Sequence, residues 1–219
     1  MTITETYEIL CKQLNSFWTI DNREKDMLME NIENAVKKTV ESYERSNRIY
    51  FLKMGFSVYN SNVYAVFLHY LSTAIGKLSG GAILADKLYY LNKIINGVEW
   101  YWNIELPEHF VVEHPLGSVL GRAQYGDYFC IYQGVTVGAN FNEGECIWPI
   151  IGNNVTMYAN STVIGECIIG NNVIIGANAF LINEKIPDNC IVYGSSPDII
   201  IKTMPEDEIK KKLVRIWKF

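Results

Sequence analysis

The sequence has little that would mark a secreted or metal-binding protein. Its five cysteines are odd in number, lie far apart and include no CxxC pair. Such a set argues against a disulfide framework and gives no reason to expect a zinc site or another metal centre. The first residues also lack the basic start and apolar core of a secretory signal. These absences predict a soluble protein of the cytoplasm that carries no metal ion.

Long apolar runs and patches of a single charge are also missing. The most apolar segment, Val63 to Leu78, is interrupted by His69, Ser72 and Lys77, so it is not suited to cross a membrane. The formal net charge is −5, and acidic and basic residues are mixed along the chain. No row of cations is available to neutralise nucleic-acid phosphates. Neither a membrane nor a nucleic acid is expected as a partner.

The apolar residues recur with a different spacing in each half of the chain. With 219 residues, of which 49% are hydrophobic, the chain can bury a core. Up to about residue 96, apolar side chains recur three and four positions apart, which is the spacing of amphipathic helices. Asp21 is a candidate helix cap, and Asn60–Asn62 and Gly80–Gly81 are candidate breaks. We expect residues 1–96 to form a helical N-terminal domain.

Beyond Gly97 a period of six replaces the helical period. Residues 151–168 and 169–186 are identical at ten of eighteen positions, which reveals an internal repeat of eighteen residues. Three short strands per eighteen-residue coil fit this period, because one aliphatic side chain per hexad then points inward. The sequence predicts a triangular β-solenoid over residues 97–204. The inward positions are expected to be Ile151, Met157, Val163, Ile169, Ile175 and Leu181.

The register is interrupted once. It extends upstream through Tyr125, Ile131 and Val137, but positions 137 and 151 differ by fourteen, two more than two hexads. Residues 138–149 are therefore expected to leave the solenoid as a loop, and loops on rigid scaffolds often carry binding residues. After Pro187 the repeat ends, and residues 205–219 are expected to form a helical tail.

Three motifs in the second half resemble those of the serine O-acetyltransferases, a group of hexapeptide-repeat acyltransferases. Gln133-Gly-Val-Thr-Val-Gly138 is similar to the coil before that family's extended loop. Ile175-Gly-Ala-Asn-Ala179 is similar to a coil that lines the coenzyme site, and Tyr193-Gly-Ser-Ser-Pro197 to the exit from the solenoid. The helical first half also fits. The resemblance implies a left-handed parallel β-helix, assembly as a homotrimer or a multiple of three, and acetyl-coenzyme A bound between neighbouring solenoids.

The resemblance also implies the catalytic residues. The family's histidine follows an aspartate about one coil before the Gln-Gly-Val-Thr motif, and Glu113-His114 matches that pair. A carboxylate fifteen residues earlier orients the histidine, and Glu99 stands at that position. A neutral imidazole can take the proton of an attacking hydroxyl and return a proton to the leaving thiolate. We therefore expect His114 to be the base and Glu99 to fix its tautomer.

The binding residues are assigned by the same resemblance. The family's loop closes with a histidine-proline pair whose histidine holds the carboxylate of the acceptor, whereas this chain has Trp148-Pro149. An indole has a single donor and a flat face, so the acceptor could be serine, a related hydroxy amino acid or a sugar hydroxyl. Residues expected at the acceptor are Glu113, Asn140 and Trp148. Residues expected at coenzyme A are Ala159, Gly176, Ala177, Ser195 and Lys202.

Other interpretations stay open at this point. A His-Pro pair such as His114-Pro115 is usually a simple turn; His109 is expected to face solvent, and His69 is expected in a helical core. The chain could instead acetylate an amino-sugar nucleotide, in which case loss of His114 would matter less, because amines need less help from a base. It could also be a non-catalytic assembly subunit, which would not bind coenzyme A.

Overall fold

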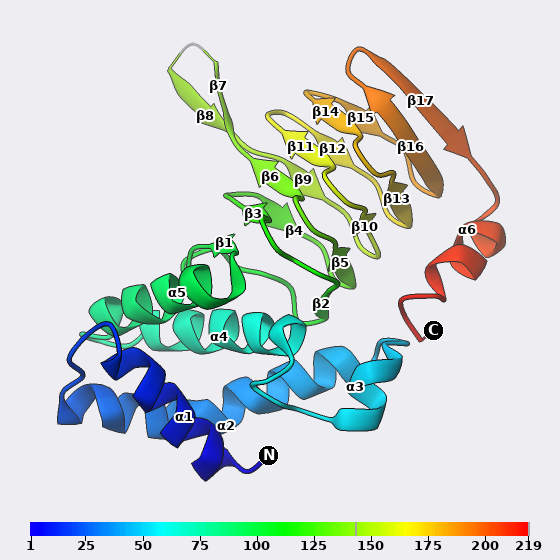
Figure 1. Ribbon diagram of the computed structural model, residues 1–219. Helices are drawn as coiled ribbons and strands as arrows, with labels where there is room; N and C mark the ends of the chain where they lie inside the picture. Colours follow the sequence, from blue (N-terminus) through cyan, green and yellow to red (C-terminus); the bar gives the residue numbers. More distant parts are fainter. Residues whose placement is uncertain (143, 219) are drawn as a thin grey trace.

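The structure, a computed structural model of the chain, describes residues 1–142 and 144–218 (Figure 1). Residue 143 of the expected loop and the last residue of the expected tail lie outside the described residues. A helical first half is followed by a parallel β-solenoid of about five turns, which confirms the predicted fold class. The division into domains 1–96, 97–204 and 205–219 stays a prediction.

The first half is organised around a buried central helix, α4. Eleven of its residues are buried, and it packs against α2, α5 and strand β2 (Phe110–Val112). Asp21 begins α2 with a capping box that includes Glu24, and the side chain of Asn60 accepts hydrogen bonds at the start of α4. The helices are α1 (Ile3–Asn15), α2 (Asn22–Glu44), α3 (Ile49–Met54), α4 (Ser61–Gly76) and α5 (Ala82–Asn96). None of the described helices combines the length and apolarity needed to cross a bilayer.

The parallel strands of the solenoid stack into three faces. Face 1 contains β1 (Glu99–Trp100), β3 (Val119–Leu120), β6 (Thr136–Gly138), β11 (Thr162–Ile164) and β14 (Phe180–Ile182). Face 2 contains β2 (Phe110–Val112), β5 (Phe129–Ile131), β10 (Thr156–Met157), β13 (Val173–Ile175) and β16 (Cys190–Ser195). Face 3 contains β4 (Gln124–Tyr125), β9 (Ile150–Ile151), β12 (Ile168–Ile169) and β15 (Lys185–Ile186). All six predicted inward positions are buried.

Three corners join these faces. Corner A leads from face 2 to face 1 and consists of residues 113–118, 132–135, 158–161 and 176–179. Corner B leads from face 1 to face 3, and corner C leads from face 3 to face 2. The predicted excursion lies at corner B, where β7 (Asn140–Asn142) and β8 (Glu145–Ile147) form an antiparallel hairpin that projects from the solenoid (Figure 1).

The asparagine pairs of the repeat stabilise corner C. Oδ1 of Asn171 accepts a hydrogen bond from the backbone N–H of Asn153 in the preceding coil, at 2.9 Å. Asn154 and Asn172 both have left-handed backbone angles, and their side chains donate to Asn172 and Asn189 respectively, each at 2.8 Å. Asparagine tolerates this conformation better than most residues. The repeated Asn-Asn pair is therefore explained by coil stacking.

The chain ends by folding back onto the helical half. After β17 (Asp198–Thr203), which is antiparallel to β16, helix α6 (Glu206–Leu213) packs Ile209 and Leu213 against face 2. The backbone N–H of Asn47 donates to the carbonyl of Ile216 at 2.7 Å, and the indole of Trp217 is completely buried. The tail thus connects the last coils to the segment between α2 and α3.

Candidate active site

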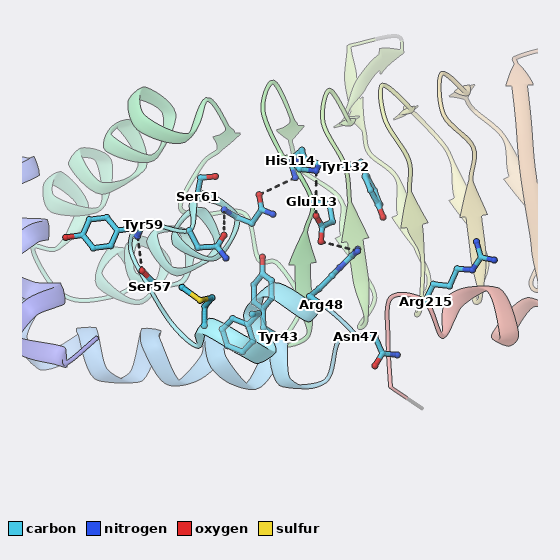
Figure 2. Close-up of a pocket in the computed structure, with 14 residues that line it drawn as sticks. Tyr43, Asn47, Arg48, Ser57, Tyr59, Ser61, Glu113, His114, Tyr132 and Arg215 are labelled. Carbon is cyan, nitrogen blue, oxygen red and sulfur yellow. Dashed lines mark hydrogen bonds and ion pairs between the residues drawn. The ribbon is translucent and has the colours of Figure 1, made fainter.

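His114 lies at corner A, directly after β2. Its imidazole is accessible, since 78% of the side chain is exposed. Its backbone has φ 50°, a left-handed conformation that is uncommon for a residue with a Cβ atom. The backbone N–H of His114 donates to Oδ1 of Asn62, near the start of α4, at 3.2 Å. Solenoid and helical half therefore meet at this residue (Figure 2).

The neighbouring carboxylate of Glu113 connects His114 to Arg48. The Glu113 backbone N–H continues the face 2 ladder by donating to the carbonyl of Ile131 at 3.0 Å. Its Oε1 lies 3.1 Å from Nη1 of Arg48, and its Oε2 lies 4.0 Å from Nε2 of His114. A separation of 4.0 Å is a charge contact rather than a hydrogen bond. Glu113, predicted at the acceptor, is thus beside His114.

Arg48 is nearly buried, with 13% of its side chain exposed. Its Nη2 donates to Sγ of Cys130 at 3.1 Å, and its guanidinium lies 5.7 Å from the ring centroid of Tyr132. Burial opposes the charge, but the neighbouring Cys130, Tyr132 and Glu113 raise the pKa of Arg48 above its ordinary value. Arg48, Glu113, His114 and Tyr132 line one cavity of about 740 Å³ between the solenoid, the helical half and the segment after α6, which contributes Arg215.

Glu99 is held on the α5 side of face 1. It accepts a hydrogen bond from the hydroxyl of Tyr89 and forms an ion pair with Lys93. Burial opposes the charge of this carboxylate, but hydrogen bonds from Lys93 and Tyr89 lower the pKa of Glu99 below its ordinary value. Within residues 1–142 and 144–218, no hydrogen bond joins Glu99 to His114. The structure does not bring the predicted base and its predicted orienting residue together.

Asn140 and Trp148 belong to the hairpin at corner B. Asn140 pairs with Ile147 in the hairpin, and its Oδ1 accepts from the N–H of Phe141 at 2.9 Å. Trp148 is 42% exposed, and the guanidinium of Arg122 lies 5.4 Å from its ring. Face 1 separates this corner from corner A. Within one chain, the two predicted acceptor residues of the loop are therefore on a different corner from His114.

Three of the predicted coenzyme residues, Ala159, Gly176 and Ala177, share corner A with His114. Backbone hydrogen bonds link the coils there: Asn160 N–H donates to the carbonyl of Gln133 at 2.8 Å, and Asn178 N–H to that of Ala159 at 2.9 Å. Ala159 and Ala177 therefore lie at equivalent positions of successive coils, stacked along corner A. We call this stack the corner A column, and the turn that carries His114 is its first coil. Ala159 and Ala177 present small side chains on these two coils, and the coil between His114 and Ala159 carries the exposed Gln133.

Gly176 has a further packing constraint, and Ser195 and Lys202 lie outside corner A. A Cβ atom on Gly176 would lie 2.7 Å from Cδ1 of Tyr193, so packing within the chain already requires glycine there. Ser195 is exposed at the end of β16, beside β14. Lys202 pairs with Ile191, at the opposite end of β16 from Ser195. Sequence reasoning missed Lys211 and Lys212 of α6 and Arg215 just after it, which line a hollow of about 570 Å³ together with Gly176 and Ala177.

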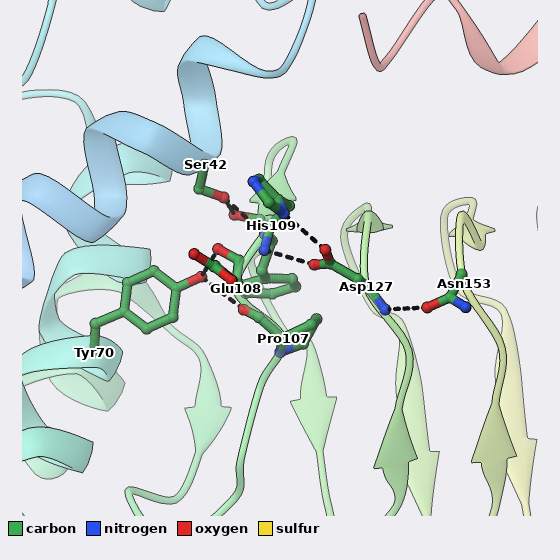
Figure 3. A network of polar contacts seen from close by, with 8 residues as sticks. Ser42, Tyr70, Pro107, Glu108, His109, Asp127 and Asn153 are labelled. Atoms are coloured by element: carbon green, nitrogen blue, oxygen red, sulfur yellow. Dashed lines mark hydrogen bonds and ion pairs between the residues drawn. The ribbon is translucent and has the colours of Figure 1, made fainter. Parts of the chain in front are cut away.

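His109 forms a second histidine–carboxylate pair (Figure 3). Its Nδ1 lies 2.7 Å from Oδ2 of Asp127, and its backbone N–H donates to Oδ1 of the same residue at 2.8 Å. The ring stacks on Tyr128 at 4.6 Å, and 16% of the side chain is exposed. The expectation that His109 faces solvent was wrong, because Asp127 and Tyr128 of the next coil hold it. His69 is buried in α4, as expected.

Sequence reasoning also missed Arg48 and Asn62. Both residues come from the helical half, and Asn62 stands 52 positions before His114. Neither residue belongs to a motif or to the six-residue register, so no signal in the sequence pointed to them. Only the packing of the helices against the first coil brings them to corner A. Within the described part of the chain, no group of three His, Cys, Asp or Glu residues is arranged to hold a metal ion.

Comparisons of the sequence with known proteins find a transferase repeat and several serine acetyltransferases. Residues 149–183 match the profile of the bacterial transferase hexapeptide (six repeats). The chain is 34% identical over 85 residues to the serine acetyltransferase of Synechococcus elongatus, an alignment that covers 38% of this chain and 35% of that protein. It is 30% identical over 107 residues to the serine acetyltransferase of Staphylococcus xylosus, which covers 48% and 49% of the two chains. The chain thus spans between about a third and a half of these relatives.

Solved structures agree with the fold over a larger part of the chain. A Neisseria gonorrhoeae serine acetyltransferase in complex with serine has a TM-score of 0.65 at 22% identity, covering 89% of this chain and 82% of that one. A Brucella abortus serine acetyltransferase in complex with coenzyme A has a TM-score of 0.66 at 21% identity, covering 83% and 74%. The chain carries a hexapeptide transferase repeat. The relatives and structures named here are all serine acetyltransferases, in agreement with the resemblance of the sequence motifs.

Proposed function

We propose that this chain is an acetyl-coenzyme A-dependent O-acetyltransferase, similar to serine acetyltransferases, that acts on the hydroxyl of a small acceptor. The observation that carries the proposal is the position of His114 at the head of the corner A column. An accessible imidazole stands at one end of that column, and Ala159 and Ala177 follow on later coils. The column offers an extended pantetheine arm a path along the solenoid, with its thioester at His114.

In this proposal His114 acts as general base. It takes the proton of the acceptor hydroxyl while the oxygen attacks the thioester carbonyl. The new C–O bond forms, the C–S bond breaks, and the imidazolium returns the proton to the leaving thiolate. The products are an acetyl ester and free coenzyme A. The resemblance assigns the orienting role to Glu99, while Glu113 is the carboxylate within 4.0 Å of the ring.

We further propose that the active unit is a trimer or a multiple of three. Asn140 and Trp148, at corner B, and His114, at corner A, are separated by face 1 within one chain. A neighbouring solenoid that contributes its hairpin to corner A would unite them in one acceptor site. Cyclic closure supplies each chain with such a neighbour.

For the coenzyme, we propose that Ala159 and Ala177 line the pantetheine arm, with Gly176 and Ser195 further along. The phosphates need cations, and Lys202 was the sequence-based candidate. Lys211, Lys212 and Arg215 line the same hollow as Gly176 and Ala177. They are the better candidates because they line the hollow themselves, whereas Lys202 does not line it and only its strand partner Ile191 does.

We also propose a reducing compartment, the cytoplasm, as the location. All five cysteines are free thiols, and Cys130, Cys167 and Cys190 are buried. Free thiols at these positions are typical of reducing compartments.

The test is direct acetylation of a panel of acceptors. Purified protein is incubated with acetyl-coenzyme A and either L-serine, L-homoserine or a sugar nucleotide, and released thiol and acetylated product are measured. We expect thiol release that depends on a hydroxyl acceptor and yields an ester. A product that is an amide would instead indicate N-acetylation of an amino sugar. Absence of both product and coenzyme A binding would favour a non-catalytic assembly subunit.

A further inference from the structure

We infer that the helical half positions the base: Arg48 and Asn62 are positioning residues that hold the Glu113–His114 turn. The inference rests on the proposed role of His114. The two contacts come from separate segments, Arg48 from the connection between α2 and α3 and Asn62 from the first turn of α4. They hold two consecutive residues of the solenoid, one through its side chain and the other through its backbone.

The Asn62 contact supports a backbone conformation that needs support. A non-glycine residue with a φ of 50° is strained, and such residues persist where surrounding contacts fix them. Oδ1 of Asn62 accepts from the His114 N–H at 3.2 Å. Asn62 is itself fixed, because its own N–H donates to the helix cap Asn60 at 3.2 Å. A rigid helix start therefore holds the backbone of His114.

Arg48 is equally well fixed. Its guanidinium fork spans Glu113 and the sulfur of Cys130, each at 3.1 Å, a geometry that one ammonium group cannot reproduce. The preceding residue, Asn47, is tied to the C-terminal segment by its backbone bond to Ile216 and by a side-chain bond to the carbonyl of Val214 at 2.5 Å. The tail thus supports the segment that carries Arg48.

The electrostatic consequence concerns the charge state of His114. Arg48 compensates the Glu113 carboxylate, whose free oxygen lies 4.0 Å from Nε2. Without Arg48 that carboxylate would stabilise the imidazolium more strongly, and a smaller fraction of His114 would be the neutral base at a given pH. Among the side chains that the structure describes, the other ionisable groups that line the cavity are those of Arg215, just after α6, and the phenols of Tyr43, Tyr59 and Tyr132. Burial raises the pKa of Tyr43 and Tyr132, so these two phenols stay neutral near pH 7.

The test compares Arg48→Met, Arg48→Lys, Asn62→Ala and Asn62→Asp with Lys77→Met. Lys77 is the matched control, because it makes an exposed ion pair at 2.7 Å with Glu105, outside the cavity. Each full-length variant is measured in two ways. The pH dependence of kcat/KM gives the effect on turnover, and imidazole NMR titration gives the midpoint of His114 independently of activity.

We expect Arg48→Met to raise the His114 titration midpoint and the acidic limb of kcat/KM by roughly half a pH unit. We also expect kcat to fall by about ten- to a hundredfold, with little change in coenzyme A affinity. Arg48→Lys should keep the midpoint, because it keeps the charge, but should not recover full kcat. Asn62→Ala should lower kcat about tenfold, and Asn62→Asp, which keeps an accepting oxygen, should recover part of it.

The inference is overturned if the Arg48 and Asn62 variants match Lys77→Met in both midpoint and kcat. If Arg48→Met does not fold, as judged by circular dichroism, the kcat values of Arg48→Lys and Asn62→Ala decide the question. The second criterion is whether Asn62→Asp recovers part of the kcat that Asn62→Ala loses. If the wild type acetylates no acceptor, the proposed function fails. The NMR midpoint then still decides whether Arg48 acts on His114.

Discussion

Nε2 of His114 lies 4.0 Å from Oε2 of Glu113, whose other oxygen pairs with Arg48. At that distance Glu113 lies beside the imidazole without fixing its tautomer through a hydrogen bond. The carboxylate that the resemblance assigns to this task, Glu99, is instead engaged with Tyr89 and Lys93. The roles of the two carboxylates can be separated by experiment.

On the orienting role that the resemblance assigns to Glu99, we expect Glu99→Gln to lower kcat by roughly tenfold, less than removal of the base, because the imidazole stays in place. KM for the acceptor should change little. Steady-state kinetics of Glu99→Gln, with Tyr89→Phe as the matched control, provides the measurement. Tyr89→Phe removes a hydrogen bond to Glu99 and keeps its charge, so its effect should be smaller. An unchanged kcat in Glu99→Gln would assign Glu99 a purely structural role.

Trp148→Ala should raise KM for the true acceptor by about two- to tenfold, the range expected for one aromatic stacking contact. Coenzyme A affinity should stay the same, and Trp148→His should improve activity on L-serine by restoring an imidazole for its carboxylate. Phe141→Ala is the control, because Phe141 is an exposed aromatic residue of the same hairpin, at 74% exposure. Equal effects of the two alanine variants, or a loss of thermal stability without any change in KM, would mean that Trp148 only anchors the hairpin.

Burial lowers the pKa of His69 from 6.5 to about 4, although the backbone carbonyls of Trp100 and Ile104 oppose the shift. Because the folded state resists protonation, the unfolded state binds the extra proton as the pH falls below 6.5. His69 should therefore cost the folded state stability between pH 6.5 and 4, by about 3 kcal/mol at the acidic end.

Urea unfolding of the wild type and His69→Gln at pH 7.5, 5.5 and 4.5 measures this effect. The comparison removes the contribution of carboxylates, which both proteins share. We expect the wild type to lose stability relative to the variant as the pH falls. Parallel stability curves would contradict the assignment.

The protein should have three or six times the mass of one chain in solution, because a site shared between corners A and B needs a neighbouring copy for each subunit. Light scattering coupled to size-exclusion chromatography at micromolar concentration gives the mass. A stable monomer that still turns over substrate would refute the shared site.

The solenoid could be predicted because its signal is local and repeated. One buried aliphatic residue per hexad fixes the strands, and the second Asn-Asn pair, Asn171–Asn172, falls at the same corner as the first. His114 was singled out for a related reason, since it lies one coil before a recognisable motif, and its catalytic role stays a prediction. The excursion at 138–149 followed from a break in the same register.

The contacts around His114 could not be predicted in this way. Asn62 meets His114 across 52 positions, and Arg48 meets Glu113 only because α2, α3 and α4 pack on the first coil. Such tertiary contacts leave no period in the sequence. His109 was misjudged for the same reason, because its partner Asp127 lies on the next coil.

The measurement that tests the central proposal most directly is the rate of acetyl transfer by His114→Ala, with His109→Ala as its matched control. His109 is the right control because it forms the shorter histidine–carboxylate contact, 2.7 Å to Asp127. The account predicts that His114→Ala lowers kcat by roughly 10²–10⁴ with coenzyme A affinity nearly unchanged, while His109→Ala retains turnover. A loss below tenfold for His114→Ala, or a larger loss for His109→Ala, would contradict it.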